Sequence, residues 1–130
     1  MGVAQAAQVD VHVTGVSDPH GHVRVELCTR DTFLTSSCPY AAAAPAMMGD
    51  TLVQIAEVPP GLYAVQAYHD DLDAGHLHQN ILGIPRERVG FSNDAPVRLQ
   101  GPAFNDAAFV VGQDSRKVTL RLRKILGGKD

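Results

Sequence analysis

Short segments in which apolar and polar residues alternate are the feature that most constrains this fold. The period of two is seen in Val9-Asp-Val-His-Val13, in Val23-Arg-Val-Glu-Leu27 and in Val118-Thr-Leu-Arg-Leu122. Because successive side chains of a β-strand point to opposite faces, each segment predicts a strand with one buried and one solvated face. The residues expected to point into the core are Val9, Val11, Val13, Val23, Val25, Leu27, Tyr63, Val65, Leu120 and Leu122.

Turns rich in glycine and proline separate the strands, and no stretch has the apolar spacing of an amphipathic helix. Turns are expected at Gly15–Gly21 and Val58–Gly61. The alanine-rich segment Tyr40–Met47 contains Pro45, which cannot donate to a sheet ladder, so we expect an edge strand there. The pattern predicts an all-β fold: a single antiparallel β-sandwich of about seven strands, transthyretin- or immunoglobulin-like. Helical turns should be short at most, and residues 69–100 should form one long irregular loop.

Composition favours one globular domain and excludes two classes of protein. Hydrophobic residues make up 45% of the 130 residues, which is enough for a core. The net charge of −3 excludes the basic surface of a nonspecific nucleic-acid binder. No apolar run approaches the roughly 18 residues of a membrane span. We expect one domain over residues 8–126, with flexible tails at 1–7 and 127–130.

The two cysteines, Cys28 and Cys38, favour a disulfide over a pair of free thiols. An even cysteine count across one polar loop suits a small exported domain, and the bridge would add roughly 2–3 kcal/mol of stability. Cys28 follows Arg24 and Glu26 at every second position of the strand, so its side chain should point outward as theirs do. The bridge is therefore expected at the surface or at a sheet edge. Ala4-Gln-Ala6 resembles the end of a signal peptide, although it is equally explained as a loose tail. Together these features predict a periplasmic or extracellular location.

The loop after residue 68 concentrates residues that bind metals. The candidate ligands are His69, Asp70, Asp71, Asp73, His76 and His78. Imidazole combined with carboxylate favours zinc, copper or nickel over calcium. If Tyr40–Met47 is a real strand, the turn holding His20 and His22 lies at the same end of the sandwich. The alternative is a solvated polar loop in which His69 only fixes the loop shape.

The same loop is also a candidate ligand pocket. The candidate binding residues, which combine glycines, an aromatic ring and polar groups, are Gly83, Pro85, Phe91, Ser92 and Asn93. Alternatively, the loop covers a sheet edge, with Phe91, Phe104 and Phe109 as plugs of the core. No Gly-x-Ser-x-Gly motif is present, and only an arrangement of Ser92 with a histidine and an aspartate is left open for a hydrolase.

Four motifs together resemble one bacterial family. They are Tyr68-His-Asp70, Leu82-Gly-Ile-Pro85, Gly90-Phe-Ser-Asn93 and Gly101-Pro-Ala-Phe-Asn-Asp-Ala-Ala-Phe109. With the turn and strand Val58–Val65, they look like the family named domain of unknown function 2141. The resemblance implies a secreted or periplasmic β-sandwich with no assigned activity. Family members often carry asparagines where this chain has Leu72 and Ala74, whose side chains cannot bind calcium.

These observations predict a non-catalytic exported binding or envelope-associated module that uses the 69–95 loop. Its partner would be a small molecule, a peptide or an envelope protein, in an undetermined oligomeric state. The first alternative is a periplasmic protein that binds a divalent metal through the 69–78 loop, and the second is a hydrolase.

Overall fold

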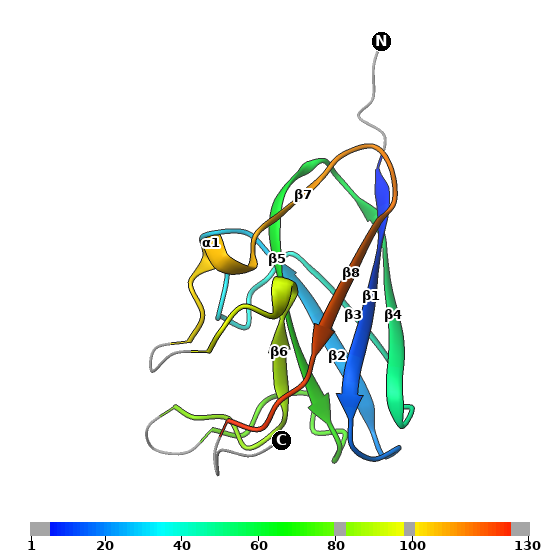
Figure 1. The fold of residues 1–130 in the computed structure, drawn as a ribbon, viewed down its shortest axis with the longest axis vertical. Coiled ribbons are helices and arrows are strands. Elements are labelled where there is room, and N and C mark those ends of the chain that lie inside the picture. Colours follow the sequence, from blue (N-terminus) through cyan, green and yellow to red (C-terminus); the bar gives the residue numbers. More distant parts are fainter. Residues whose placement is uncertain (1–5, 80–82, 98–100, 126–130) are drawn as a thin grey trace.

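Two β-sheets pack face to face in this chain (Figure 1). A computed structural model describes residues 6–79, 83–97 and 101–125. The three-stranded sheet has the order β4 (Gly49–Val58), β1 (Ala7–Val16) and β8 (Arg116–Arg121). The five-stranded sheet has the order β3 (Tyr40–Pro45), β2 (His22–Cys28), β5 (Gly61–Asp70) and β6 (Val89–Phe91), with β7 (Phe109–Val111) paired to the start of β5. Two short helices, η1 (Ser92–Asp94) and α1 (Phe104–Ala107), follow β6.

The main core lies between the two sheets, and the alternating pattern predicted it. All ten residues expected to point inward are buried in one cluster. The prediction of an all-β sandwich with only short helices is confirmed, and β3 is an edge strand as expected. One strand pair departs from the antiparallel prediction, because β1 runs parallel to β8. Alternation fixes which face of a strand is buried, but it carries no information about the direction of a neighbour.

The two sheets are joined along one side by close backbone contacts. Val89 of β6 and Arg123 exchange two hydrogen bonds between their main chains, at 2.9 and 2.8 Å. Gly90 faces the same segment, and a Cβ atom at this position would lie 2.5 Å from the carbonyl oxygen of Arg121. The approach of β6 to the end of β8 therefore requires glycine at residue 90.

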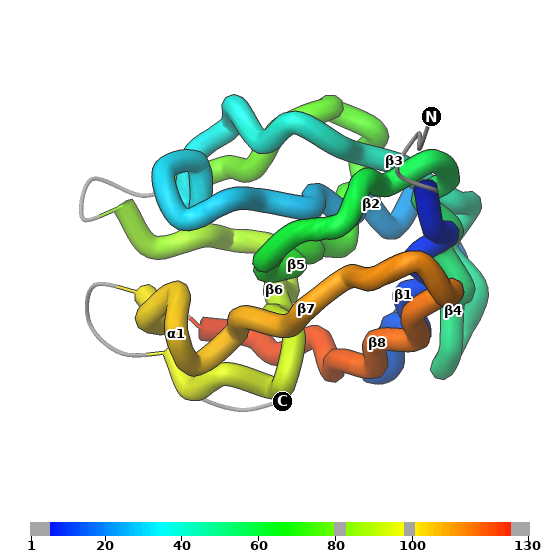
Figure 2. The backbone as a smooth tube through the Cα atoms, turned by 90° about the horizontal axis from the view of Figure 1, so that it is seen from above, coloured from blue at the N-terminus to red at the C-terminus, as the bar shows by residue number. Residues whose placement is uncertain are grey.

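A second apolar cluster covers the outer face of the five-stranded sheet. It consists of Cys28, Phe33, Ala64, Tyr68, Val89, Phe91, Ala95, Phe104 and Ala107. The 29–38 loop and α1 supply its cover, and they lie on the side of β2 and β5 that faces away from β1 and β4 (Figure 2). The ring of Phe33 packs edge-on against Phe91 and Phe104, with centroids 5.9 and 5.7 Å apart.

This cover explains where the disulfide lies. Cys28 and Cys38 are bonded, as predicted, with Cα atoms 4.6 Å apart. The outward parity of Cys28 is also correct, but its expected exposure is wrong: Cys28 is fully buried because the loop folds back over it. Of the predicted tails, residues 1–5 and 127–130 lie outside the described residues, and Ala7 already belongs to β1.

Candidate functional site

A groove of about 790 Å³ lies on the outer face of the five-stranded sheet. Its floor consists of side chains from β2, β5 and β6. Its walls come from the 29–38 loop, from the segments on either side of residues 80–82 and from the segment that precedes α1. The described lining residues that matter most below are Glu26, Leu34, Gln66, Tyr68, His76, Ile84 and Phe91. The volume falls within the range of roughly 300–1,000 Å³ that is typical of sites for small molecules.

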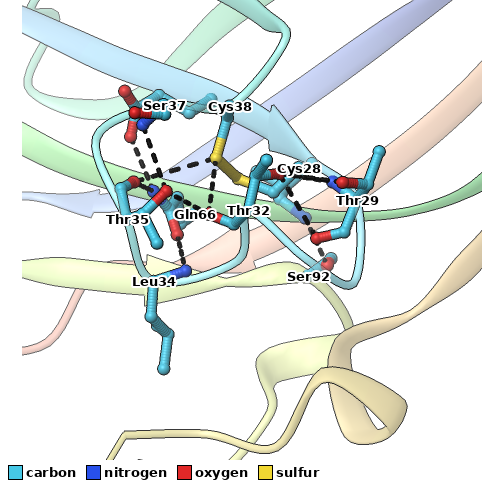
Figure 3. The surroundings of a disulfide bond; sticks show 11 residues. Cys28, Thr29, Thr32, Leu34, Thr35, Ser37, Cys38, Gln66 and Ser92 are labelled. Atoms are coloured by element: carbon cyan, nitrogen blue, oxygen red, sulfur yellow. Dashed lines mark hydrogen bonds between the residues drawn. A yellow bond between two sulfur atoms is a disulfide. The ribbon is translucent and has the colours of Figure 1, made fainter.

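The disulfide loop forms one wall, and Gln66 of β5 fixes it to the floor (Figure 3). The Gln66 side chain accepts the backbone N–H of Leu34 at 2.7 Å. Its amide nitrogen donates to the carbonyl oxygen of Thr35 and to Oε1 of Glu26, both at 2.7 Å. Because both ends of this amide are used, Gln66 is a positioning residue for the wall.

Asp70 organises the opposite wall, where the chain leaves β5. Its fully buried carboxylate accepts the backbone N–H groups of Ala74 and Gly75, each at 2.8 Å, and the Arg24 guanidinium at 2.6 Å. Burial by itself raises the pKa of Asp70, but the hydrogen bond from Arg24 and the two backbone N–H groups outweigh it and lower the pKa below 3.8. Arg24 thus supplies the positive charge for a carboxylate that the sequence suggested as a metal ligand.

The other candidate metal ligands are distributed over separate contacts. His69 is buried and its Nε2 donates to the carbonyl oxygen of His20 at 2.7 Å, which is the shape-fixing role considered above. Asp71 pairs with Arg86 at 2.8 Å, and Asp73 pairs with His22 at 2.6 Å. Within residues 6–79, 83–97 and 101–125, no group of three or more histidine, cysteine, aspartate or glutamate side chains is arranged to hold a metal ion.

Two of these contacts confirm one spatial expectation. The first turn and the 70s loop meet at the same end of the sandwich, through His20 with His69 and through His22 with Asp73. A Cβ atom on Gly21, whose φ is +70°, would lie 2.0 Å from the carbonyl oxygen of Asp70. The turn therefore packs directly against the start of the loop, and glycine is required there.

His76 and His78 are the two candidate ligands that the structure brings together. Their ring centroids lie 4.8 Å apart. Nδ1 of His76 faces the carbonyl oxygen of Leu77 at 3.1 Å, and Nδ1 of His78 faces Oε2 of Glu87 at 2.5 Å. A carbonyl or carboxylate oxygen only accepts, so each Nδ1 is the donor in its contact, and a ring in its neutral form then has its lone pair on Nε2. Burial acts to raise the pKa of Glu87, but hydrogen bonds from the His78 ring and backbone lower it overall.

The candidate pocket residues divide into two groups. Gly83, Pro85 and Phe91 line the groove. Ser92 and Asn93 do not, because both act within the fold: the buried Ser92 hydroxyl accepts the Val65 N–H at 2.9 Å and donates to the Ala107 carbonyl at 2.5 Å. The Asn93 amide donates to the carbonyl oxygens of residues 106 and 108 at 3.3 and 3.0 Å.

The same contacts bear on the hydrolase alternative. Both hydrogen-bonding functions of the Ser92 hydroxyl are used by the backbone, and no histidine is among its partners. Phe104 and Phe109 are buried as core plugs, which was the alternative to a pocket role. Phe91 does both, since it packs in the outer cluster and lines the groove.

Two floor residues, Glu26 and Tyr68, were not singled out as site residues from the sequence. From the sequence, Glu26 was placed only on the outward face of its strand. The pairing register of β2 with β5 is what identifies them as neighbours: Glu26 lies opposite Gln66, and Arg24 lies opposite Tyr68. Burial raises the pKa of the Tyr68 phenol, and the nearby Asp70 carboxylate adds to this shift. The Tyr68 hydroxyl has no hydrogen-bond partner in the part of the chain that the structure describes.

The fold and this groove define a small β-sandwich domain whose loops build a ligand-sized depression on one sheet. The chain belongs to the family described as "Uncharacterized protein conserved in bacteria (DUF2141)", which it matches over residues 11–119. The family resemblance seen in the sequence is therefore confirmed. No curated protein and no solved structure shows a match to the chain. Among the residues with described coordinates, no helix is long and apolar enough to cross a membrane.

Proposed function

We propose that this chain is a non-catalytic, exported binding domain that takes up a small organic molecule in the groove on β2, β5 and β6. The observation that carries the proposal is the groove itself, with its volume of about 790 Å³. Apolar residues such as Leu34 and Ile84 in the walls and Phe91 on the floor surround a few polar groups, which is the usual composition of small-molecule sites.

The rigid support of both walls adds to this proposal. The disulfide and Gln66 hold one wall, and the buried Asp70 carboxylate, paired with Arg24, holds the other. A site whose walls are fixed before binding loses less conformational freedom when the ligand enters. A buried disulfide is also typical of proteins that fold outside the cytoplasm, which supports the exported part of the proposal.

The test is a screen of small aromatic and aliphatic compounds by 15N–1H NMR on the oxidised protein. Binding in the groove should shift the amide signals of residues such as Gln66, Tyr68 and Phe91 together. Ser36 lines the groove and is exposed, whereas the equally exposed Ser37 does not line it. Ser36→Trp should therefore block the hits, and Ser37→Trp is the matched control that should leave them intact. Hits that shift another surface, or that survive Ser36→Trp unchanged, would contradict the proposal.

A second candidate function is divalent metal binding by His76 and His78. It is favoured by one observation: the two ring centroids lie 4.8 Å apart, and each Nδ1 donates to an oxygen, so Nε2 is the nitrogen of each ring that is left to bind a metal. Engagement of the second nitrogen by a carbonyl or carboxylate is typical of metal-binding histidines. Two protein ligands would leave the remaining positions to water, and such a site suits Cu²⁺, Ni²⁺ or Zn²⁺.

Metal binding is tested by thermal melts of chelator-treated protein with each of the three ions. A metal at 100 times its Kd should stabilise the fold by about 2.7 kcal/mol, a shift of several degrees. His76→Ala or His78→Ala should abolish the shift, and His12→Ala, which alters an outward residue of β1, should preserve it. No shift with any of the ions, or an equal shift in all variants, would refute this second candidate.

A further inference from the structure

The floor of the groove contains a carboxylate that forms no ion pair with any cation among the described residues. Glu26 is partly buried, and its Oε1 accepts only the neutral Gln66 amide at 2.7 Å. Its other oxygen has no hydrogen bond or ion pair with any described residue. The described lining of the groove also contains no lysine and no arginine. The groove therefore presents a negative charge within apolar walls.

The nearest arginine along the strand does not change this balance. Arg24 lies two residues before Glu26 on β2 and shares its outward face. Its guanidinium is held by the fully buried Asp70 carboxylate, 2.6 Å away, so its charge is already compensated. Arg24 and Asp70 form a neutral pair beside the groove, and Glu26 is left without an ion pair among the described residues.

Tyr68 gives the groove a second group suited to a cation. It lies on β5, its hydroxyl oxygen has no partner among described residues, and it lines the same floor as Glu26. A phenol oxygen accepts a hydrogen bond from an ammonium group, and an aromatic ring attracts a cation over its face. Phe91, Leu34 and Ile84 offer apolar surface for the rest of a ligand.

We propose that the ligand of this groove is a small organic cation: a primary amine on an apolar body, with its ammonium group at Glu26 and Tyr68. This inference rests on the proposed function and adds the charge of the ligand to it. The sign follows from the carboxylate, because an anionic ligand would meet an uncompensated negative charge in a partly dehydrated site. A neutral ligand would bind, but it would leave Glu26 without a partner.

The experiment uses three probes that share one apolar body: 4-phenylbutylamine, 4-phenylbutanol and 4-phenylbutyrate. Each is titrated into the oxidised full chain and followed by 15N–1H NMR at residues 26, 66 and 68. The amine should bind at least about tenfold more tightly than the alcohol, and the acid should bind most weakly. Raising the salt concentration should weaken the amine and leave the alcohol unchanged.

Two variants test the contribution of the Glu26 charge to binding. Glu26→Gln keeps an oxygen for the Gln66 amide and removes only the charge, so it should cost the amine at least about tenfold in affinity. The alcohol should bind this variant as before, which shows that the groove is intact. Glu57→Gln, an exposed carboxylate on β4, is the matched control and should have no effect.

The outcomes separate the two claims. Equal binding of amine and alcohol, or full amine affinity in Glu26→Gln, would overturn the cation assignment while leaving the groove as a small-molecule site. Binding of none of the three probes at the groove would overturn both the cation assignment and the proposed function.

Discussion

Removal of the disulfide between Cys28 and Cys38 should destabilise the domain by an amount that the structure specifies. The bridge closes a loop with a sequence separation of 10. The loop-entropy relation for a loop of this length gives about 2.8 kcal/mol at 25 °C. For a domain of this size, that corresponds to a fall in Tm of about 10 °C.

The assay is a thermal melt of the protein with and without a phosphine reductant, next to the double variant Cys28→Ala/Cys38→Ala. The double variant should melt lower than the reduced protein, because Cys28 is fully buried and truncation leaves a cavity. The reductant should leave the melting temperature of the double variant unchanged. This control shows that the reductant acts on the protein only by breaking the disulfide.

Groove binding should weaken along with stability, since the 29–38 loop is one wall of the groove. The hydrogen bonds of Gln66 to Leu34 and Thr35 and the packing of Phe33 would then hold the loop without the bridge. A fall in Tm of less than about 3 °C on complete reduction would refute the reasoning, because the other contacts of the loop would then fix it without the bridge.

Three further predictions concern buried contacts. The pKa of Asp70 is lowered from 3.8, so as the pH falls this group is protonated in the unfolded chain before it is protonated in the folded one. The unfolding free energy measured by urea titration should therefore be constant near neutrality and decline below about pH 4. Asp70→Asn should be less stable at pH 7, and its unfolding free energy should decline less at acidic pH. A wild-type curve that stays level down to pH 2 would contradict this. Ser92→Ala should cost about 2–4 kcal/mol in urea unfolding because it leaves a buried N–H and a buried carbonyl unpaired, and a loss under 0.5 kcal/mol would show that the backbone re-pairs. Gly90→Ala should cost about 2 kcal/mol or more, whereas Gly112→Ala, whose Cβ would meet no atom within 4 Å, should cost little; equal melting points for the two variants would refute the close approach of β6 to β8.

The strands and the core could be predicted from the sequence because a period of two needs only local information. Every alternating segment became a strand with the expected face buried, and Pro45 marked an edge strand correctly. The exposure of Cys28 was misjudged for a non-local reason. The alternating pattern predicts to which face of the strand a side chain points, but only the folded chain shows that the 29–38 loop covers that face.

The candidate site was predicted only in part, because polar residues in loops serve either a ligand or the fold. Ser92 and Asn93 had the composition of pocket residues, yet their partners lie up to 27 residues away in the sequence and are backbone atoms. Asp70 likewise matched a metal ligand until Arg24, 46 residues away, was found to be its partner. Glu26 belongs to the site only because β5 places Gln66 and Tyr68 beside it.

The parallel pairing of β1 with β8 governs when this chain is able to fold. The two strands meet across most of the sequence: the Thr14 hydroxyl, for instance, donates to the carbonyl oxygen of Leu120, 106 residues away. Until residues 116–121 are available, β1 has β4 on one side and an open edge on the other, and the core lacks Leu120 and Leu122. Pairings this distant fold slowly. The complete core between the two sheets therefore forms only after the last strand is available to pair with the first.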